Sequence, residues 1–306
     1  MIAAALALLL GAAGWWAYTP DRTRAALEAQ YHVTQEEYRD IAGLRVRFRD
    51  TGNRAGPALL LLHGFGSSLE TWEGWAGLLD AQYRVIRLDL PGFGLTGADP
   101  AGDYSDQRGA VILAGLLEAL GVERAVVIGN SLGGKLAWFM AASHPERVSG
   151  LVLVAPDGFA SPGFEYGHAP SIPPLLRLLP YSAPRVLLRQ SLLPAYADPM
   201  SLTDAVVDRY WNMLRAPGVR RAILARTAQL KLEDPVPMLQ RVRVPVLLLW
   251  GVEDRMIPVT HAVDYQAALP NASLATLPGL GHVAFEEDPG RSIQPLLGYL
   301  SSLAHR

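Results

Sequence analysis

The sequence has no cysteine among its 306 residues. It can therefore form no disulfide, no thiolate nucleophile and no cysteine-ligated zinc or iron–sulfur site. Charge is also sparse, because charged side chains make up 18% of the chain and the formal net charge at pH 7 is −2. This balance lacks the basic surface that nucleic-acid binding requires, so nucleic acid is not an expected partner. What the chain does have is an apolar fraction of 50% and enough length for a large core.

A long apolar run opens the chain and ends in Trp15, Trp16 and Tyr18. At about 1.5 Å per residue, residues 1–18 would span roughly 27 Å as a helix, close to the thickness of a bilayer core. The aromatic cluster is typical of a membrane interface. We expect residues 1–20 to form an uncleaved membrane anchor whose orientation stays open. One alternative is a cleaved signal, which would leave the protein secreted or periplasmic; another is a helix packed on the protein.

Two blocks, residues 37–155 and 244–306, alternate strand-like and helix-like patterns after a connector at 21–36. Strict alternation predicts a hairpin over 37–49 that turns at Ala42-Gly43, and the continuously apolar stretch 58–62 predicts a strand covered on both faces. Further strands are expected at 84–89, 125–128, 148–154, 244–250 and 273–277, and helices at 69–79, 107–120, 260–268 and 293–303. This order predicts an α/β fold with a mostly parallel eight-stranded sheet flanked by helices.

Residues 156–243 interrupt this alternation with twelve prolines and short leucine- and arginine-rich pieces. Proline at this density breaks a segment into brief helices and turns, so no strand of the main sheet is expected there. We interpret the segment as a helical lid inserted after the sixth strand, because long insertions of this kind are often functional covers. An ordinary helical subdomain is the alternative. The leucines of this segment suggest a hydrophobic substrate, but a helical lid would also need them for its own core; they lie at 175, 176, 178, 179, 187 and 188.

A serine stands at a glycine-framed corner between a predicted strand and a predicted helix, in Gly129-Asn130-Ser131-Leu132-Gly133. Gly129 and Gly133 leave no side chain where the chain doubles back, so Ser131 can occupy a strained conformation with its hydroxyl exposed. This context is that of a nucleophile elbow, although the pentapeptide alone is common in ordinary turns. Ser131 is the candidate nucleophile.

A serine nucleophile needs a base, and the base needs an orienting acid. His282 follows the last predicted strand on a glycine-rich loop, so it should share the carboxyl edge of the sheet with Ser131. Asp254, after the strand ending at 250, is the preferred acid, and Asp157 is its rival. The order Ser131, Asp254, His282 matches that expected for a nucleophile elbow in this architecture.

Acyl transfer also needs donors for the developing oxyanion. The backbone N–H of Leu132, next after the nucleophile, should supply one. The N–H of Phe65 should supply the other, since Gly64 lets the backbone approach closely. His63 is expected to be a structural hydrogen-bonding residue of the same loop.

Five ordered motifs now resemble the α/β-hydrolase superfamily. They are His63-Gly64-Phe65-Gly66, Asp89-Leu90-Pro91-Gly92-Phe93-Gly94, Gly129-Asn130-Ser131-Leu132-Gly133-Gly134, Gly251-x-x-Asp254 and Gly281-His282. The similarity spans about residues 37–304. Within it, the Asn before the serine and the Gly-Gly after it resemble meta-cleavage-product (carbon–carbon bond) hydrolases and related esterases. Relatives that open epoxides or remove halide have an aspartate where this chain has Ser131. The carbon–carbon hydrolases usually have Trp where this chain has Val283.

The resulting hypothesis is a serine hydrolase of carboxylic esters with a hydrophobic moiety. It needs no metal and no organic cofactor. The first alternative is carbon–carbon hydrolysis of a vinylogous diketone with the same triad, and the second is a ligand-binding homologue without turnover. The partner is a small molecule, and the oligomeric state stays open.

Overall fold

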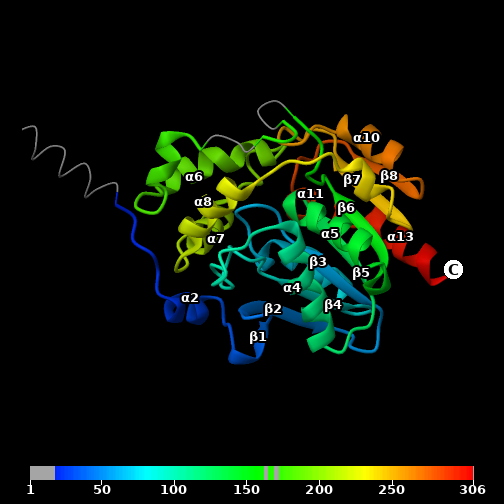
Figure 1. Cartoon of the computed structure of the whole chain (residues 1–306), viewed down its shortest axis with the longest axis horizontal. Coiled ribbons are helices and arrows are strands. Elements are labelled where there is room, and N and C mark those ends of the chain that lie inside the picture. The colour runs from blue at the N-terminus through cyan, green and yellow to red at the C-terminus, as the bar shows by residue number, and fades with distance from the viewer. Residues whose placement is uncertain (1–17, 162–164, 169–171, 306) are drawn as a thin grey trace, which may run out of the picture.

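An eight-stranded sheet forms the centre of the computed structural model, which describes residues 18–161, 165–168 and 172–305. The strands are β1 (Tyr38–Ile41), β2 (Leu44–Gly52), β3 (Ala58–Leu62), β4 (Arg84–Leu88), β5 (Ala125–Asn130), β6 (Val148–Val154), β7 (Val246–Gly251) and β8 (Ala272–Leu277). Their order is β1-β2-β4-β3-β5-β6-β7-β8; β3 to β8 pair in parallel, and β2 pairs antiparallel with both β1 and β4. This confirms the expected mostly parallel sheet (Figure 1).

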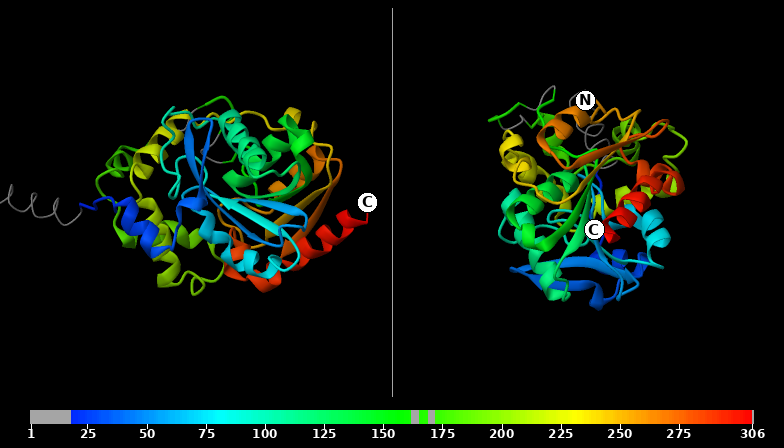
Figure 2. Two further views of the ribbon diagram at one scale, coloured as in Figure 1. Left: turned by 90° about the horizontal axis from the view of Figure 1, so that it is seen from below. Right: turned by 90° about the vertical axis from the view of Figure 1, so that its right-hand side faces the viewer.

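Helices cover both faces of the sheet (Figure 2). One face carries η2 (Leu69–Trp72), α3 (Glu73–Leu79), α11 (Ala284–Glu287), α12 (Pro289–Ser292) and α13 (Gln294–Ala304). The other carries α4 (Asp106–Ala119), α5 (Leu132–Ser143), α9 (Val236–Leu239) and α10 (His261–Ala268). Leu59 and Leu61 of β3 point into the first core, and Leu60 and Leu62 into the second. The apolar run in β3 is continuous because both of its faces are buried.

The hairpin turns where the alternating pattern predicts. Ala42 and Gly43 have φ values of 47° and 81°, and two consecutive positive φ values are the mark of the type I′ turn that suits a two-residue hairpin. The helix expected over 69–79 is instead a 3₁₀ turn, η2, followed by α3. Short helices, α2 (Arg24–Gln30) and η1 (Gln35–Glu37), occupy the connector, and η3 (Pro145–Arg147) precedes β6.

A helical cap is inserted between β6 and β7, as the proline pattern predicts (Figure 1). It contains η4 (Pro174–Leu178), α6 (Arg185–Leu192), η5 (Leu193–Ala195), α7 (Asp204–Leu214) and α8 (Val219–Gln229) and ends with α9. In the described part of 156–243 no strand joins the eight-stranded sheet. The cap stands near the carboxyl ends of the strands, and its residue Ala195 contacts the loop that carries His282.

The expected membrane anchor lies almost entirely outside the described residues, which begin at Tyr18. Across 18–161, 165–168 and 172–305, no helix combines the length and apolarity needed to cross a bilayer. The chain that follows the apolar run is fixed to the cap. Thr19 N–H donates to Tyr181 O over 2.9 Å, and Arg22 N–H to Arg215 O over 2.8 Å. An ion pair of 2.6 Å joins Asp21 to Arg220.

Candidate active site

Ser131 lies at the corner between β5 and α5 with φ 52° and ψ −119°. A side chain on Gly129 would place its Cβ 2.2 Å from Gly133 O, and one on Gly133 would come within 2.2 Å of Leu62 O. Both contacts are far inside van der Waals distance, so only glycine allows the helix to start this close to β3 and β5. The surroundings thus hold Ser131 in a sparsely populated conformation, which is a feature of functional sites.

His282 and Asp254 form a buried hydrogen-bonded pair at the carboxyl edge of the sheet. His282 Nδ1 lies 2.7 Å from Asp254 Oδ2, and the other carboxylate oxygen accepts the N–H groups of Met256 at 2.8 Å and Ile257 at 2.9 Å. An ionised carboxylate can only accept, so Nδ1 carries the proton and Nε2 is left with its lone pair. That tautomer is the one a general base requires.

The rival acid, Asp157, makes no hydrogen bond to His282 in the described part of the chain. Its N–H donates to Ser131 O over 3.0 Å, and its own carbonyl accepts from Trp138 Nε1 and Tyr265 Oη. Burial raises the pKa of its carboxyl group. Asp157 therefore supports the elbow through its backbone, while Asp254 orients the imidazole.

Asn130 links the serine and histidine loops. Its side-chain Nδ2 donates to Val154 O and to His282 O, each over 3.1 Å, and His282 N–H donates to Ala195 O of the cap over 2.8 Å. Among the described residues no hydrogen bond joins Ser131 Oγ to His282. Catalytic hydrogen bonds often tighten only when substrate binds.

The loop 63–66 lies against the elbow. A Cβ on Gly64 would come 3.3 Å from Ser131 Cβ and 2.8 Å from Asn130 Oδ1, so the glycine allows the close approach expected of an oxyanion loop. Phe65 itself is exposed and packs edge-on against Phe93, with ring centroids 5.4 Å apart. Leu132 is buried at the first position of α5.

His63 anchors this loop and is buried. Its Nδ1 lies 2.7 Å from Gly64 O, and its Nε2 accepts the Leu90 N–H over 3.0 Å. Burial lowers the pKa of His63 to about 4. The ring is therefore neutral at physiological pH, and both of its nitrogens make hydrogen bonds within the protein. These contacts agree with a structural role for His63.

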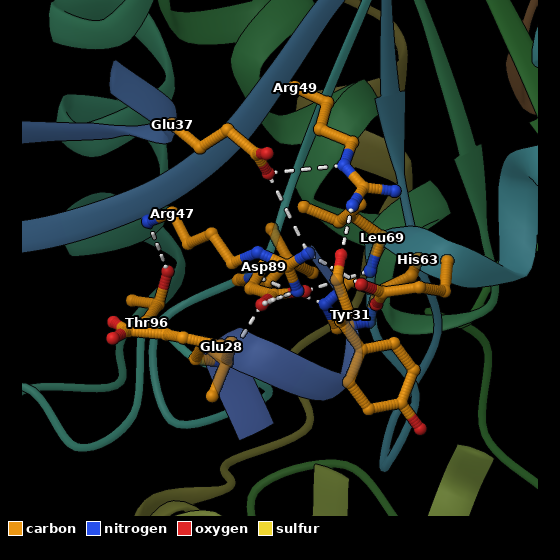
Figure 3. Close-up of polar contacts among 12 residues, drawn as sticks. Glu28, Tyr31, Glu37, Arg47, Arg49, His63, Leu69, Asp89 and Thr96 are labelled. Carbon is orange, nitrogen blue, oxygen red and sulfur yellow. Dashed lines mark hydrogen bonds and ion pairs between the residues drawn. The ribbon is translucent and has the colours of Figure 1, made fainter. Parts of the chain in front are cut away.

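A buried ionic cluster fixes the chain just after this loop, at Leu69 (Figure 3). Asp89 accepts the N–H groups of Leu69 at 2.8 Å and Leu95 at 2.7 Å, and it lies 3.3 Å from Arg47 Nη1. Arg47 also pairs with Glu70 at 2.6 Å. Burial raises the pKa of Asp89 to about 6, against the opposing pull of Arg47. The Asp89 motif thus fixes where η2 starts, and with it the position of residues 63–69.

Sequence comparison agrees with this geometry: residues 57–289 match the family described as alpha/beta hydrolase fold. The chain belongs to the α/β-hydrolase family. The eight-stranded sheet and the helical cap inserted between β6 and β7 are consistent with that membership.

Relatives of this α/β-hydrolase carry several activities. A 2-hydroxy-6-oxo-6-phenylhexa-2,4-dienoate hydrolase from Burkholderia cepacia is 31% identical over 255 residues, which cover 80% of this chain and 87% of that protein. A crystal structure of a membrane phospholipase A, described as a bacterial virulence factor, is 27% identical with a TM-score of 0.73 and covers 100% of this chain and 99% of that chain. A meta-cleavage product hydrolase from Pseudomonas fluorescens IP01 shares the fold at 24% identity and a TM-score of 0.75, with 87% of this chain and 97% of that chain covered.

Several residues around the site are not marked by any sequence motif. Glu287 accepts the N–H groups of Gly281 at 2.9 Å and Asp198 at 2.8 Å, and so ties the histidine loop to the cap. Arg226 of α8 is buried close to Phe93. These contacts join segments far apart in sequence, so only the fold reveals them.

Proposed function

We propose that the protein is a serine hydrolase in which Ser131, His282 and Asp254 form the catalytic triad. The contact that carries this proposal is the 2.7 Å hydrogen bond between His282 Nδ1 and Asp254 Oδ2, next to a serine in a strained elbow. His282 Nε2 takes the hydroxyl proton as Ser131 Oγ attacks the substrate carbonyl, and later returns a proton to the leaving group. The N–H groups of Phe65 and Leu132 stabilise the oxyanion.

For the substrate, we infer a carbon–carbon bond next to a ketone in a dienoate of the meta-cleavage type. The support is the 31% identical dienoate hydrolase, which this chain matches over most of its length. Attack on the ketone forms the new C–O bond, and the breaking C–C bond leaves its electron pair on the departing fragment as a dienolate. That fragment takes the proton that His282 removed from Ser131, and water then hydrolyses the acyl-enzyme, which releases the acid and restores the serine.

A carboxylic ester, in particular a lipid ester, is the second candidate. Two observations favour it: Val283 follows His282 where carbon–carbon hydrolases usually have Trp, and the match to the 27% identical membrane phospholipase A covers 100% of this chain. The same triad would transfer the acyl group to Ser131, release the alcohol with a proton from His282, and hydrolyse the acyl-enzyme with water.

Kinetics on a matched panel tests these proposals. Purified protein would be assayed on 2-hydroxy-6-oxo-6-phenylhexa-2,4-dienoate, p-nitrophenyl butyrate and a lysophospholipid, with Ser131→Ala as the control. Carbon–carbon hydrolysis requires the dienoate to have the highest kcat/KM, and the ester alternative requires one of the esters to have it. Activity retained by Ser131→Ala, or failure of a fluorophosphonate to label Ser131, would overturn the triad.

We also propose that residues 156–243 act as a lid and that residues 1–18 anchor the protein to a membrane. Cap side chains that are large, apolar and exposed support the second proposal; they are Leu175, Leu176, Leu178, Tyr181, Val186 and Leu187. Thr19, at the end of the apolar run, bonds directly to Tyr181 in the same region. The anchor would therefore place this face of the cap toward the lipid surface.

Membrane association can be measured without reference to activity. The full chain should sediment with lipid vesicles or bacterial membranes, and a chain lacking residues 1–17 should move to the soluble fraction because it loses most of its apolar segment. Retaining Thr19 and Asp21 keeps the contacts with the cap. Equal partitioning of the two chains would contradict the anchor.

A further inference from the structure

Arg226 of α8 is a largely buried cation. Only 8% of its surface is exposed, and within the described residues its guanidinium makes no hydrogen bond and no ion pair. Its guanidinium carbon lies 5.7 Å from the centroid of the Phe93 ring. Burying an unpaired charge is costly, so a side chain kept in this state points to a ligand that supplies the missing partner.

The guanidinium borders a cavity of about 280 Å³ between the cap and the core. Its walls include Tyr104, Leu132, Lys135, Trp138, Phe139 and Arg226. Leu132 is the residue directly after Ser131, so the cavity adjoins the nucleophile elbow. Phe93, which Arg226 contacts, also packs on Phe65 of the oxyanion loop at 5.4 Å. A substrate that reaches Ser131 could therefore extend one end toward Arg226.

The other charges around the cavity already have partners. Lys135 pairs with Asp106 at 2.9 Å, and Lys231 pairs with Glu233 at 3.2 Å near the solvent. Asp234 is exposed and accepts the Val236 N–H. Burial lowers the pKa of Arg226, and the nearby carboxylates of Asp106 and Asp157 oppose this. Asp106 is already paired with Lys135, and no ion pair joins Arg226 to either carboxylate in the described part of the chain. Among the charged side chains described in the cavity wall, Arg226 is the one with neither a hydrogen bond nor an ion pair.

We propose that Arg226 forms a subsite for an anionic oxygen group of the substrate, a carboxylate or a phosphate, beside the elbow. This inference rests on the proposed serine hydrolase function, because it places the acidic end of the same substrate. Apolar Leu132, Trp138 and Phe139 would contact the chain between that group and the scissile carbonyl. A dienoate brings a carboxylate to this position, and a phospholipid brings a phosphate.

Activity on paired substrates tests the subsite. The anionic substrate of the pair is the p-nitrophenyl monoester of a dicarboxylic acid, which keeps one free carboxylate. The neutral substrate is the methyl ester of the same compound. A p-nitrophenyl ester of the same length that carries a phosphate is tested beside them. In Arg226→Gln the ratio of kcat/KM for the anionic over the neutral substrate should fall roughly 10- to 100-fold, the range for losing a hydrogen bond to a charged group. Arg226→Lys should keep part of the ratio. Arg221→Gln, an exposed arginine on the same helix, is the matched control and should keep all of it.

Binding separates this subsite from the proposed chemistry. Ligand binding is measured by thermal melting of the Ser131→Ala variant, because this measurement does not depend on turnover. The anions 6-phenylhexanoate and hexyl phosphate should each raise its melting temperature more than the neutral 6-phenylhexanamide does. Arg226→Gln should abolish the excess shift, and the anion with the larger shift identifies the source. An unchanged shift, or equal losses on charged and neutral ligands, would overturn the subsite. If the shift depends on Arg226 but Ser131 is never labelled, the subsite stands and the hydrolase proposal fails.

Discussion

Two carboxylates follow strands at the same edge of the sheet, and their contacts separate their roles. Asp254 holds the imidazole of His282 at 2.7 Å, whereas Asp157 contacts the elbow only through its backbone N–H and carbonyl. From sequence alone both positions are plausible, because each lies after a buried parallel strand. The direction of one side chain decides between them, and side-chain direction in a loop has no sequence signature.

The two acids can be distinguished by amide substitution. Asp254→Asn keeps the shape but can hold His282 in the wrong tautomer, so kcat should fall roughly 10⁴-fold, the size known for triads of this kind. Asp157→Asn should retain most of kcat, since it keeps both backbone contacts. Steady-state kinetics on each variant, with thermal melting to confirm folding, checks this. The reverse order of losses would mean that Asp157 is the orienting acid.

His63 makes stability depend on pH. In the unfolded chain it takes a proton near pH 6.5, but in the folded protein burial lowers its pKa to about 4. Between these values the unfolded state binds more protons, so the free energy of unfolding falls as the pH drops, by up to about 3 kcal/mol. Asp89, whose pKa burial raises to about 6, acts in the opposite direction.

A His63→Gln variant isolates this contribution. Urea unfolding at pH 7 and pH 4.5 should show that the stability advantage of the natural protein over the variant shrinks at the lower pH, because the glutamine side chain takes up no proton. The contribution of Asp89 is common to both proteins. An advantage that is the same at both pH values would contradict neutral burial of His63.

At the scale of elements, the sequence predicts the parts whose causes are local. The hairpin follows from alternation and a turn at Ala42-Gly43, and β3 from a run buried on both faces. The 3₁₀ turn η2 that starts at Leu69 was not predictable, since its start depends on Asp89, just after β4, accepting the Leu69 N–H. Likewise, the proposed triad follows from motif order, whereas the contacts of Asn130 with Val154 and His282 join segments distant in sequence.

Two glycines on helices should respond oppositely to alanine. Gly298 of α13 is exposed with nothing within 4 Å of a new Cβ, so Gly298→Ala should stabilise the protein by about 0.5–1 kcal/mol through helix propensity. Gly133→Ala would push a methyl group into Leu62 O and should destabilise by roughly 3 kcal/mol or more. Chemical denaturation of both variants measures the contrast. Equal effects would mean that the elbow has room for a side chain.

At the scale of the whole molecule, Glu286 joins the cap to the core four residues after His282. Its carboxylate accepts from Tyr196 Oη at 2.7 Å and from Tyr210 Oη at 3.3 Å, and it pairs with Arg209, all three from the cap. Thr71 of the core also donates to it. The position of the segment that follows His282 and the packing of the cap on the core therefore depend on the same buried carboxylate.

Removing that charge should loosen the seating of the cap. Glu286→Gln leaves the largely buried Arg209 without its ion-pair partner, and breaking such a pair costs about 3 kcal/mol. Arg209→Met combined with Glu286→Gln should recover part of this loss, because no unpaired charge remains. Arg185→Met breaks exposed ion pairs to Asp204 and Asp208 on the same cap and should cost far less, because solvent screens exposed charges. Chemical denaturation of the natural protein and the three variants measures these differences in the free energy of unfolding. If Arg185→Met destabilised the protein as much as Glu286→Gln, the exposed ion pairs of the cap would matter as much as the buried contact beside His282, and this prediction would be wrong.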